Sequence, residues 1–307
     1  MDSANKQSAV IAEATVGTTP SSPGFLLLRD IRVSGSPNRE SQRSPERRAD
    51  RMAANMVTGL NSYRKSIEMP WVRDAATDVL WTSAFCAAWA TNVLTNGSTQ
   101  KTFTLEEKYE GGSTDPYRRL TGCQVDQVNI SFQTGQAGSL SFACRALQEA
   151  TATSAIASST YAAPSPGYDP VSSVGVTVNS LAGLSTPKVV GLDLTISNNL
   201  RDRHAFGSAD PGSIGLGMFD VTGRVQFLFS AAADYSTFAT RQTAQAMSLT
   251  IGTVTNYKDT LVMSGLDVWN PDVSDPGNSG EHVVTLNILA RYNATDSGAI
   301  VLTRNVA

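Results

Sequence analysis

The chain has 307 residues, of which 41% are hydrophobic and 17% charged, and its formal net charge is −3. This length allows two domains or one large β architecture, with a core that needs neither metals nor disulfides. The acidic balance gives no overall attraction for nucleic acid, which normally needs a clustered basic surface. The low charged content and the abundance of Ser, Thr and Gly favour many strands and turns.

The N-terminal segment and the cysteines indicate the compartment. Cys86, Cys123 and Cys144 are odd in number and lack C-x-x-C spacing, so a zinc site or a secreted disulfide framework is not expected. Residues 1–24 lack the apolar stretch of a signal peptide, and no run of about 18 apolar residues could span a membrane. We expect a soluble product of a reducing, intracellular environment, with residues 1–24 as a flexible N-terminal arm.

The first half of the chain is expected to begin with a strand over residues 25–35. The charged stretch 39–51 follows and is expected to form a surface loop, because it contains Pro45 among mostly charged residues. Its arginines are Arg39, Arg43, Arg47, Arg48 and Arg51.

Further elements of the first half are a strand at 62–72 and an amphipathic helix at 73–94, with Asp74 and Asp78 near its start. Residues 117–146 alternate apolar and polar positions and predict a β-hairpin. The composition then changes to Ala, Ser, Thr and Pro, which indicates a linker over 149–187 between domains at 25–148 and 188–307.

The second half repeats this order. A strand at 188–198, a long loop, a strand at 221–229, a helical stretch at 230–247 and a closing hairpin follow one another as in the first half. The sequence therefore predicts an internally duplicated, mainly β fold, a β-sandwich or barrel with short helices. On this alignment Cys144 falls opposite Ile288 and Cys123 near Leu266, so both cysteines are interpreted as packing residues.

No constellation in the sequence points to catalysis, a cofactor or a metal. His204 and His282 lie in polar segments, and no nucleophile elbow, phosphate loop or zinc motif is present. The acidic pairs Glu106/Glu107 and Asp272/Asp275 are interpreted as solvated turns. Aromatic residues that could form a sugar platform are interpreted as core, namely Trp71, Trp81 and Trp89.

Three stretches carry a resemblance to a known family: "LRDIRVSG" with the following "SPERRADR", "SIEMPWVRDAATDVLW", and "LTGCQVDQVNISFQTGQAGSLSF". Together with the order of elements from about 25 to 292, they resemble the major tail tube proteins of long-tailed bacteriophages, the siphophage tail tube family. The resemblance implies a non-enzymatic virion protein of the tail, assembled in the host cytoplasm. It also implies stacked rings around a channel through which double-stranded DNA passes without specific binding.

The resemblance further implies partners and a role for the charged insert. Partners would be other copies of the chain and further tail proteins, namely the tape measure, tail terminator and distal tail proteins. Two tube-like domains per chain would give homotrimeric rings with pseudo-sixfold symmetry. Since Arg forms bidentate contacts with carboxylates, the insert is expected to contact the next ring through Arg39, Arg43, Arg47, Arg48 and Arg51. The alternative function is a β-sandwich receptor- or carbohydrate-binding module of a virion or cell surface.

Overall fold

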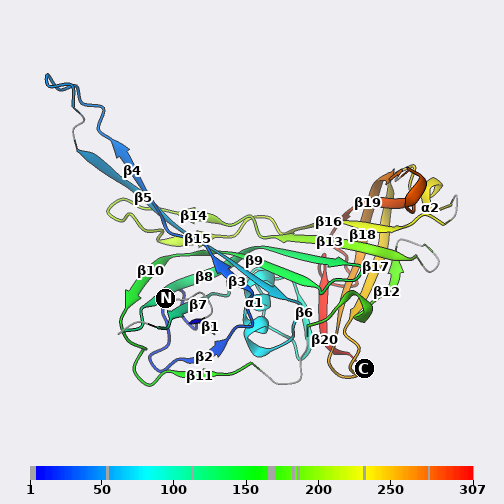
Figure 1. Cartoon of the computed structure of the whole chain (residues 1–307), viewed down its shortest axis with the longest axis horizontal. Coiled ribbons are helices and arrows are strands. Elements are labelled where there is room, and N and C mark those ends of the chain that lie inside the picture. The colour runs from blue at the N-terminus through cyan, green and yellow to red at the C-terminus, as the bar shows by residue number, and fades with distance from the viewer. Residues whose placement is uncertain are drawn as a thin grey trace.

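The computed structural model describes residues 5–52, 55–111, 114–164, 170–181, 184, 187–230, 233–275 and 277–306. Strands dominate, which confirms the mainly β prediction. The first half of the chain and the strands of the second half lie side by side, with β13 and β16 running across both (Figure 1). The N-terminus lies in the first of these regions and the C-terminus in the second.

The elements follow one another in two similar series. The first contains β1 (Lys6–Ala12), β2 (Gly24–Leu27), β3 (Arg32–Ser34), β4 (Asn38–Arg43), β5 (Met56–Pro70), α1 (Ala75–Phe85), β6 (Val93–Thr95), β7 (Phe103–Tyr109), β8 (Tyr117–Gln133), β9 (Ser139–Ala146) and β10 (Gln148–Ala152). The second contains β11 (Thr160–Ala162), a 3-10 turn (Ser173–Gly175), β12 (Val176–Leu181), β13 (Val189–Ser197), β14 (Arg201–Arg203), β15 (Ser213–Gly215), β16 (Asp220–Leu228), α2 (Ala233–Ser236), β17 (Gln242–Ile251), β18 (Lys258–Val273), a 3-10 turn (Gly277–Ser279), β19 (Val283–Ala290) and β20 (Val301–Val306).

The strand pairings repeat between the two series. In the first, β5 pairs with β9 and β9 with β8, while β7 and β10 both pair with the early part of β8. In the second, β16 pairs with β19 and β19 with β18, while β17 and β20 both pair with the early part of β18. β1 adds to β7 as β12 adds to β17. Each half therefore contains the same antiparallel pairings in the same chain order.

The halves are joined by a strand pairing between β8 and β13. Residues 127–133 of β8 run antiparallel to residues 191–197 of β13. Ser131 Oγ donates to Asp193 Oδ1 across this junction at 2.6 Å. Beyond the end of β13, buried Asn198 donates from Nδ2 to the carbonyl oxygens of Ala84 at 2.7 Å and Val125 at 2.9 Å. Backbone and side-chain bonds thus make one continuous sheet from the two halves.

Helix α1 is specified at both ends. Asp74 is the N-cap, and its side chain accepts a hydrogen bond from the backbone N–H of Thr77 at 2.8 Å. Leu80, Trp81 and Phe85 are buried in the main hydrophobic core. The helix ends at Cys86, whose φ of 50° is left-handed. The prediction of a helix over 73–94 is therefore correct for 75–85 only.

The expected flexible arm and linker are wrong over most of their length. Within 1–24, β1 pairs with β7 along its whole length and buries Ala9 and Val10. Within 149–187, β10 pairs with β8, β11 with β2, and β12 with β17. These strands form because neighbouring edges offer unpaired backbone groups, so their small polar side chains do not prevent pairing. Residues 1–4, 165–169, 182–183 and 185–186 lie outside the described residues.

Two other elements differ from expectation. The strand predicted over 25–35 is divided into β2 and β3, and Ile31 between them is 73% exposed. The helix predicted over 230–247 contains only α2 at 233–236, and β17 begins at Gln242. Met247, Leu249 and Ile251 are buried at alternate positions of β17. This period of two suits a strand against the core and cannot form a helical apolar face.

All three cysteines are free and buried. Burial raises the pKa of the Cys86, Cys123 and Cys144 thiols, so the reactive thiolate is disfavoured in the folded state. We predict that a thiol reagent will modify none of them rapidly in native protein and all of them after denaturation without reductant. Mass spectrometry of non-reduced peptides provides the control, and a peptide pair linking Cys123 to Cys144 would contradict the prediction.

Candidate functional site

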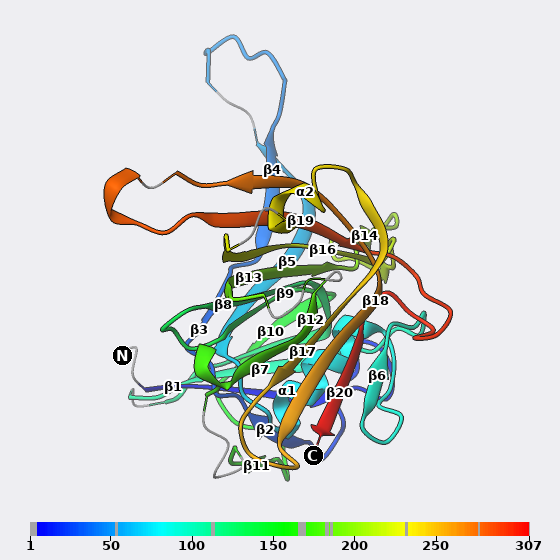
Figure 2. The same ribbon diagram turned by 90° about the vertical axis from the view of Figure 1, so that its right-hand side faces the viewer.

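The hairpin formed by β4 and β5 projects far from the body of the protein (Figures 1 and 2). Every residue of β4 is exposed. The opposite end of β5 lies in the core, where Tyr63, Ile67 and Met69 are buried. One continuous strand therefore connects the hydrophobic core to the projecting tip. The sequence predicted this segment as a surface loop, and the structure corrects it to a β-hairpin with a loop at its end.

The five predicted site arginines all lie on this hairpin. Arg39 and Arg43 are on β4, and Arg47, Arg48 and Arg51 are in the loop. In the described part of the hairpin, residues 38–52 and 55–62, the ion pair is Arg48 Nη2 to Asp50 Oδ2 at 2.8 Å. The Arg48 hydrogen bond lowers the pKa of Asp50, which keeps this carboxylate charged. The described part of the loop thus has more arginine side chains than ion pairs with carboxylates.

Apolar side chains accompany this charge. Met52 is 70% exposed, Met56 65% and Val57 56%. Exposed apolar groups clustered beside polar ones are typical of protein–protein contact surfaces. The hairpin therefore combines apolar area with positive charge, which suits a protein partner with carboxylates better than it suits bulk water.

The base of the hairpin is held by the second half of the chain. Asp210, in the loop between β14 and β15, accepts hydrogen bonds from Asn61 Nδ2 and from the Tyr63 hydroxyl, each at 2.6 Å. These bonds lower the pKa of Asp210. The backbone N–H of Asn61 also donates to the carbonyl oxygen of Ala209 at 2.8 Å. The loop of one half thus fixes the orientation of the hairpin of the other.

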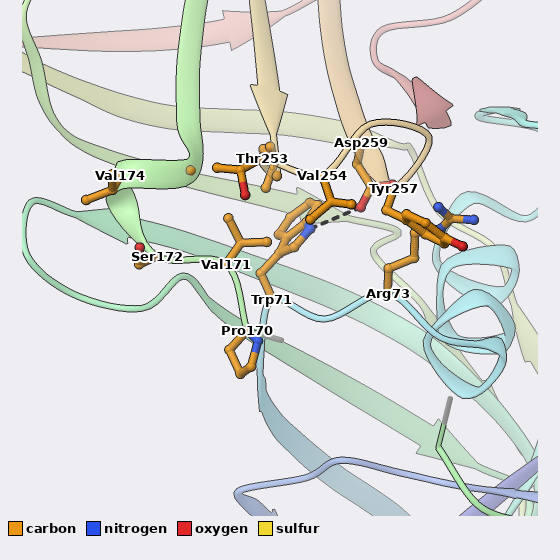
Figure 3. Close-up of a pocket in the computed structure, with 13 residues that line it drawn as sticks. Trp71, Arg73, Pro170, Val171, Ser172, Val174, Thr253, Val254, Tyr257 and Asp259 are labelled. Carbon is orange, nitrogen blue, oxygen red and sulfur yellow. Dashed lines mark hydrogen bonds between the residues drawn. The ribbon is translucent and has the colours of Figure 1, made fainter. Parts of the chain in front are cut away.

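A pocket of about 250 Å³ lies where the two halves meet (Figure 3). Trp71 forms one wall, and its indole N–H donates to Asp259 Oδ2 at 3.1 Å. Arg73 lies over the ring of Tyr257 at 5.9 Å and donates to the carbonyl oxygen of Asn256 at 3.4 Å. Trp71 and Arg73 of the first half thus contact Asn256, Tyr257 and Asp259 of the second half, and these contacts across the pocket connect the two halves.

Asp259 gives a testable pH dependence. Burial raises its pKa to about 6, against the opposing hydrogen bond from Trp71. Since the folded state holds this proton more tightly, ionisation of Asp259 destabilises the fold as pH rises from about 4 to above 6. We predict that Asp259→Asn, which keeps an acceptor for Trp71, will be more stable than wild type by about 3 kcal/mol at pH 7.5. The gain should vanish near pH 4 in urea unfolding, and an equal effect at both pH values would contradict the assignment.

The acidic pair Glu106/Glu107 contradicts its predicted place in a solvated turn. Both residues are on β7, and they are 1% and 0% exposed. Glu107 lies 2.5 Å from the Nζ atoms of both Lys6 and Lys65, whereas Glu106 lies 2.5 Å from Arg119 Nε. Asp272 and Asp275, by contrast, are exposed at the end of β18. Buried Lys65 and the partly exposed Lys6 and Arg119 explain the burial of the first pair, since each carboxylate has a charged partner.

The remaining candidates serve structural roles. Trp71 and Trp81 are in the core, whereas Trp89 lies under the Arg304 guanidinium at 4.3 Å, so the three do not form a sugar platform. His282 Nδ1 lies 2.8 Å from the carbonyl oxygen of Ser274. Among the described residues, no cluster of His, Cys, Asp and Glu is suited to a metal ion. No helix in the described ranges is long and apolar enough to cross a membrane.

Comparison with models of protein families gives a match over nearly the whole chain. The family model described as "Phage tail tube protein" matches residues 3–299. A search of curated proteins returned no match. The matched region includes the projecting hairpin, the β8–β13 junction and every repeated pairing except that of β20, which lies beyond residue 299.

Proposed function

The chain belongs to the phage tail tube protein family, whose members are structural components of the virion and not enzymes, and on this premise we propose that it polymerises into stacked rings that form the tail tube. The projecting β4–β5 hairpin is the observation that carries this proposal. A hairpin with exposed methionines and unneutralised arginines is poorly suited to an isolated monomer and well suited to contact between copies.

In this proposal the hairpin reaches the next ring along the tube. Arg39, Arg43, Arg47, Arg48 and Arg51 would contact carboxylates of that ring, while Met52 and Met56 would be covered by it. A single exposed ion pair contributes only about 0–1 kcal/mol, but every subunit of every ring repeats the contact. The inter-ring contact should therefore be strong in total and sensitive to salt.

Two equivalent β units per chain support a homotrimeric ring with pseudo-sixfold symmetry. The β8–β13 junction already places two units side by side in one sheet, as neighbours in a ring would be. Covalent connection raises the effective concentration of one unit near the other and favours their adjacent placement. The siphophage type of tail, with tape measure, tail terminator and distal tail proteins as further partners, is part of the same proposal.

The channel of such a tube would let double-stranded DNA pass without holding it. A basic lumen would bind phosphates with release of counterions and so retain DNA. The formal net charge of −3 supports a neutral or acidic lumen.

Negative-stain microscopy of the purified chain tests the proposal. We expect rings or open-ended tubes at high protein concentration and low salt. Discrete particles under every condition, together with binding to host cells or glycans, would contradict it and favour the receptor- or carbohydrate-binding alternative.

A further inference from the structure

We propose that the ring closes when β3 of one copy adds to the outer edge of β18 of the next copy, in the register by which β13 adds to β8 within the chain. This inference rests on the proposed ring assembly and names the edges that would close it. We infer it because the β8–β13 junction shows how one β unit of this chain adds to another, and the same pairing can form between two chains.

β3 is the counterpart of β13. Each is the outer strand laid antiparallel on the central strand of its half: Val33 lies opposite Ile67 of β5, and Leu192 lies opposite Val225 of β16. Ile67 and Val225 are themselves equivalent, because they lie opposite Phe142 of β9 and Leu286 of β19, four residues before the ends of those strands at Ala146 and Ala290. Val33 therefore corresponds to Leu192, and Ser34 to Asp193.

β18 is the counterpart of β8. Ile130 of β8 lies opposite Leu140 of β9, and Val273 of β18 lies opposite Val284 of β19. Leu140 and Val284 are each the second residue of their strand. The registers of the two pairs also shift at similar places, after Val125 in β8 and after Trp269 in β18. Val273 therefore corresponds to Ile130, and Ser274 to Ser131.

β3 and β18 differ from their counterparts β13 and β8 in that each has an outer edge with no partner strand among the described residues. β13 pairs with β16 on one side and β8 on the other. Within the described residues, β3 pairs with β5 alone, and residues 269–273 of β18 pair with β19 alone. Each therefore has an outer edge that no strand of the described residues occupies, although the Val33 carbonyl accepts a hydrogen bond from Lys6 Nζ at 3.1 Å. Such an edge is a template for another strand. A second copy provides both edges at once, so the addition can repeat around a ring.

Charge and exposed apolar area agree with this pairing. The equivalence places Ser34 of one copy opposite Ser274 of the next and Val33 opposite Asp275. Arg32 is one residue further along the edge, so its side chain is on the other face from that of Asp275, and the charges act along the edges and not as one ion pair. Arg32 is exposed on the first edge, whereas Asp272 and Asp275 are exposed on the second. Ile31, which is 73% exposed on the free monomer, would lie against the neighbouring chain. Opposite charges and a large exposed aliphatic residue are thus present at the edges that must meet.

The closing junction should also be weaker than the internal one. At the internal junction Leu147, which follows β9, packs with Leu200 and Ile214 in a separate apolar cluster. Its counterpart after β19 is Arg291, which forms an ion pair with Asp267. An apolar contact in the chain is thus replaced by a charged residue at the edge between chains. The chain can therefore fold as a subunit first and close into rings afterwards.

Disulfide cross-linking of Ser34→Cys/Ser274→Cys tests the edge and the register together. Within one chain, β3 and β18 are separated by seven strand spacings of about 4.8 Å in the order β3-β5-β9-β8-β13-β16-β19-β18, far beyond the reach of a disulfide. Oxidised tubes should therefore give dimers and closed trimers on a non-reducing gel. Ser34→Cys/Val273→Cys is the matched control, because neighbouring strand residues face opposite sides and should cross-link at least tenfold less.

The outcomes separate this inference from the assembly proposal. Tubes that form normally but give no cross-linked chains, or give equal cross-linking with both pairs, would overturn the edge and register while leaving the tube intact. A wild-type chain that forms no rings or tubes would overturn both. Cross-linking confined to the Ser34/Ser274 pair, and present in rings before they stack, would support closure through β3 and β18.

Discussion

Replacing Arg43, Arg47 and Arg48 together with serine is expected to leave folded subunits that assemble into tubes at least tenfold less than wild type. The reason is that these exposed guanidinium groups project on the β4–β5 hairpin and contribute nothing to the core. Each contact between rings is weak alone, but its loss is multiplied over every subunit. Sedimentation of tubes against soluble protein gives the measurement, and circular dichroism gives the check on folding.

The matched control is the triple replacement of the same residues with lysine. Lysine keeps the charge but loses the bidentate geometry, so it should assemble to an intermediate extent. Raising salt should weaken wild type and the lysine variant, and should affect the serine variant less. Wild-type levels of tubes from the serine variant at all salt concentrations would show that the hairpin arginines do not contact the next ring.

Glu107→Leu is expected to lower the free energy of unfolding by about 3–5 kcal/mol, because it leaves the buried Lys65 ammonium without its counter-charge. Burial opposes the Glu107 carboxylate, but hydrogen bonds from Lys6 and Lys65 outweigh it and lower its pKa. A lowered carboxyl pKa stabilises the fold above the unfolded pKa, and this stabilisation is lost as pH falls through the folded pKa. Wild type should therefore lose stability on acidification more steeply than Glu107→Leu.

The double variant Glu107→Leu/Lys65→Met is the control for this prediction. Removing both charges replaces the buried pair with apolar groups, so the double variant should recover most of the lost stability. Lys6 is part of the same site, but its side chain is 20% exposed and can reach water. A double variant that is as unstable as the sum of the single variants would show that Lys65 and Glu107 do not stabilise each other.

Local sequence signals predicted the elements whose periodicity is strong. The hairpin of β8 and β9 follows from alternating Leu140, Phe142, Cys144 and Ala146, all of which are buried. Helix α1 follows from an apolar face behind Asp74, which is a good N-cap. In these segments the local pattern and the tertiary environment agree.

Segments whose structure depends on distant partners were not predicted. β1 is a strand because the edge of β7 is available to it, and β10 and β11 lie on β8 and β2 in the same way. The sequence predicts a helix where β17 begins because Ala and Gln dominate that stretch, although Met247, Leu249 and Ile251 alternate at its end. The sequence does not reveal the burial of Glu106 and Glu107, because Lys65 and Arg119, which balance their charges, come from other strands.

The candidate surfaces were predicted in part. The arginine-rich insert could be recognised from composition, but the orientation of its hairpin depends on Asp210, which is 149 residues from Asn61 in the chain. The edges of β3 and β18 carry no sequence signal of their own. They are recognised only because β13 and β8, their counterparts, are paired with each other.

Cryo-electron microscopy of assembled tubes tests the proposed architecture most directly. We expect homotrimeric rings in which the two halves of each chain occupy alternate positions of a pseudo-sixfold ring, with the β4–β5 hairpins crossing to the next ring and no basic lumen. Rings built from six complete chains, or a channel lined by lysine and arginine, would contradict it.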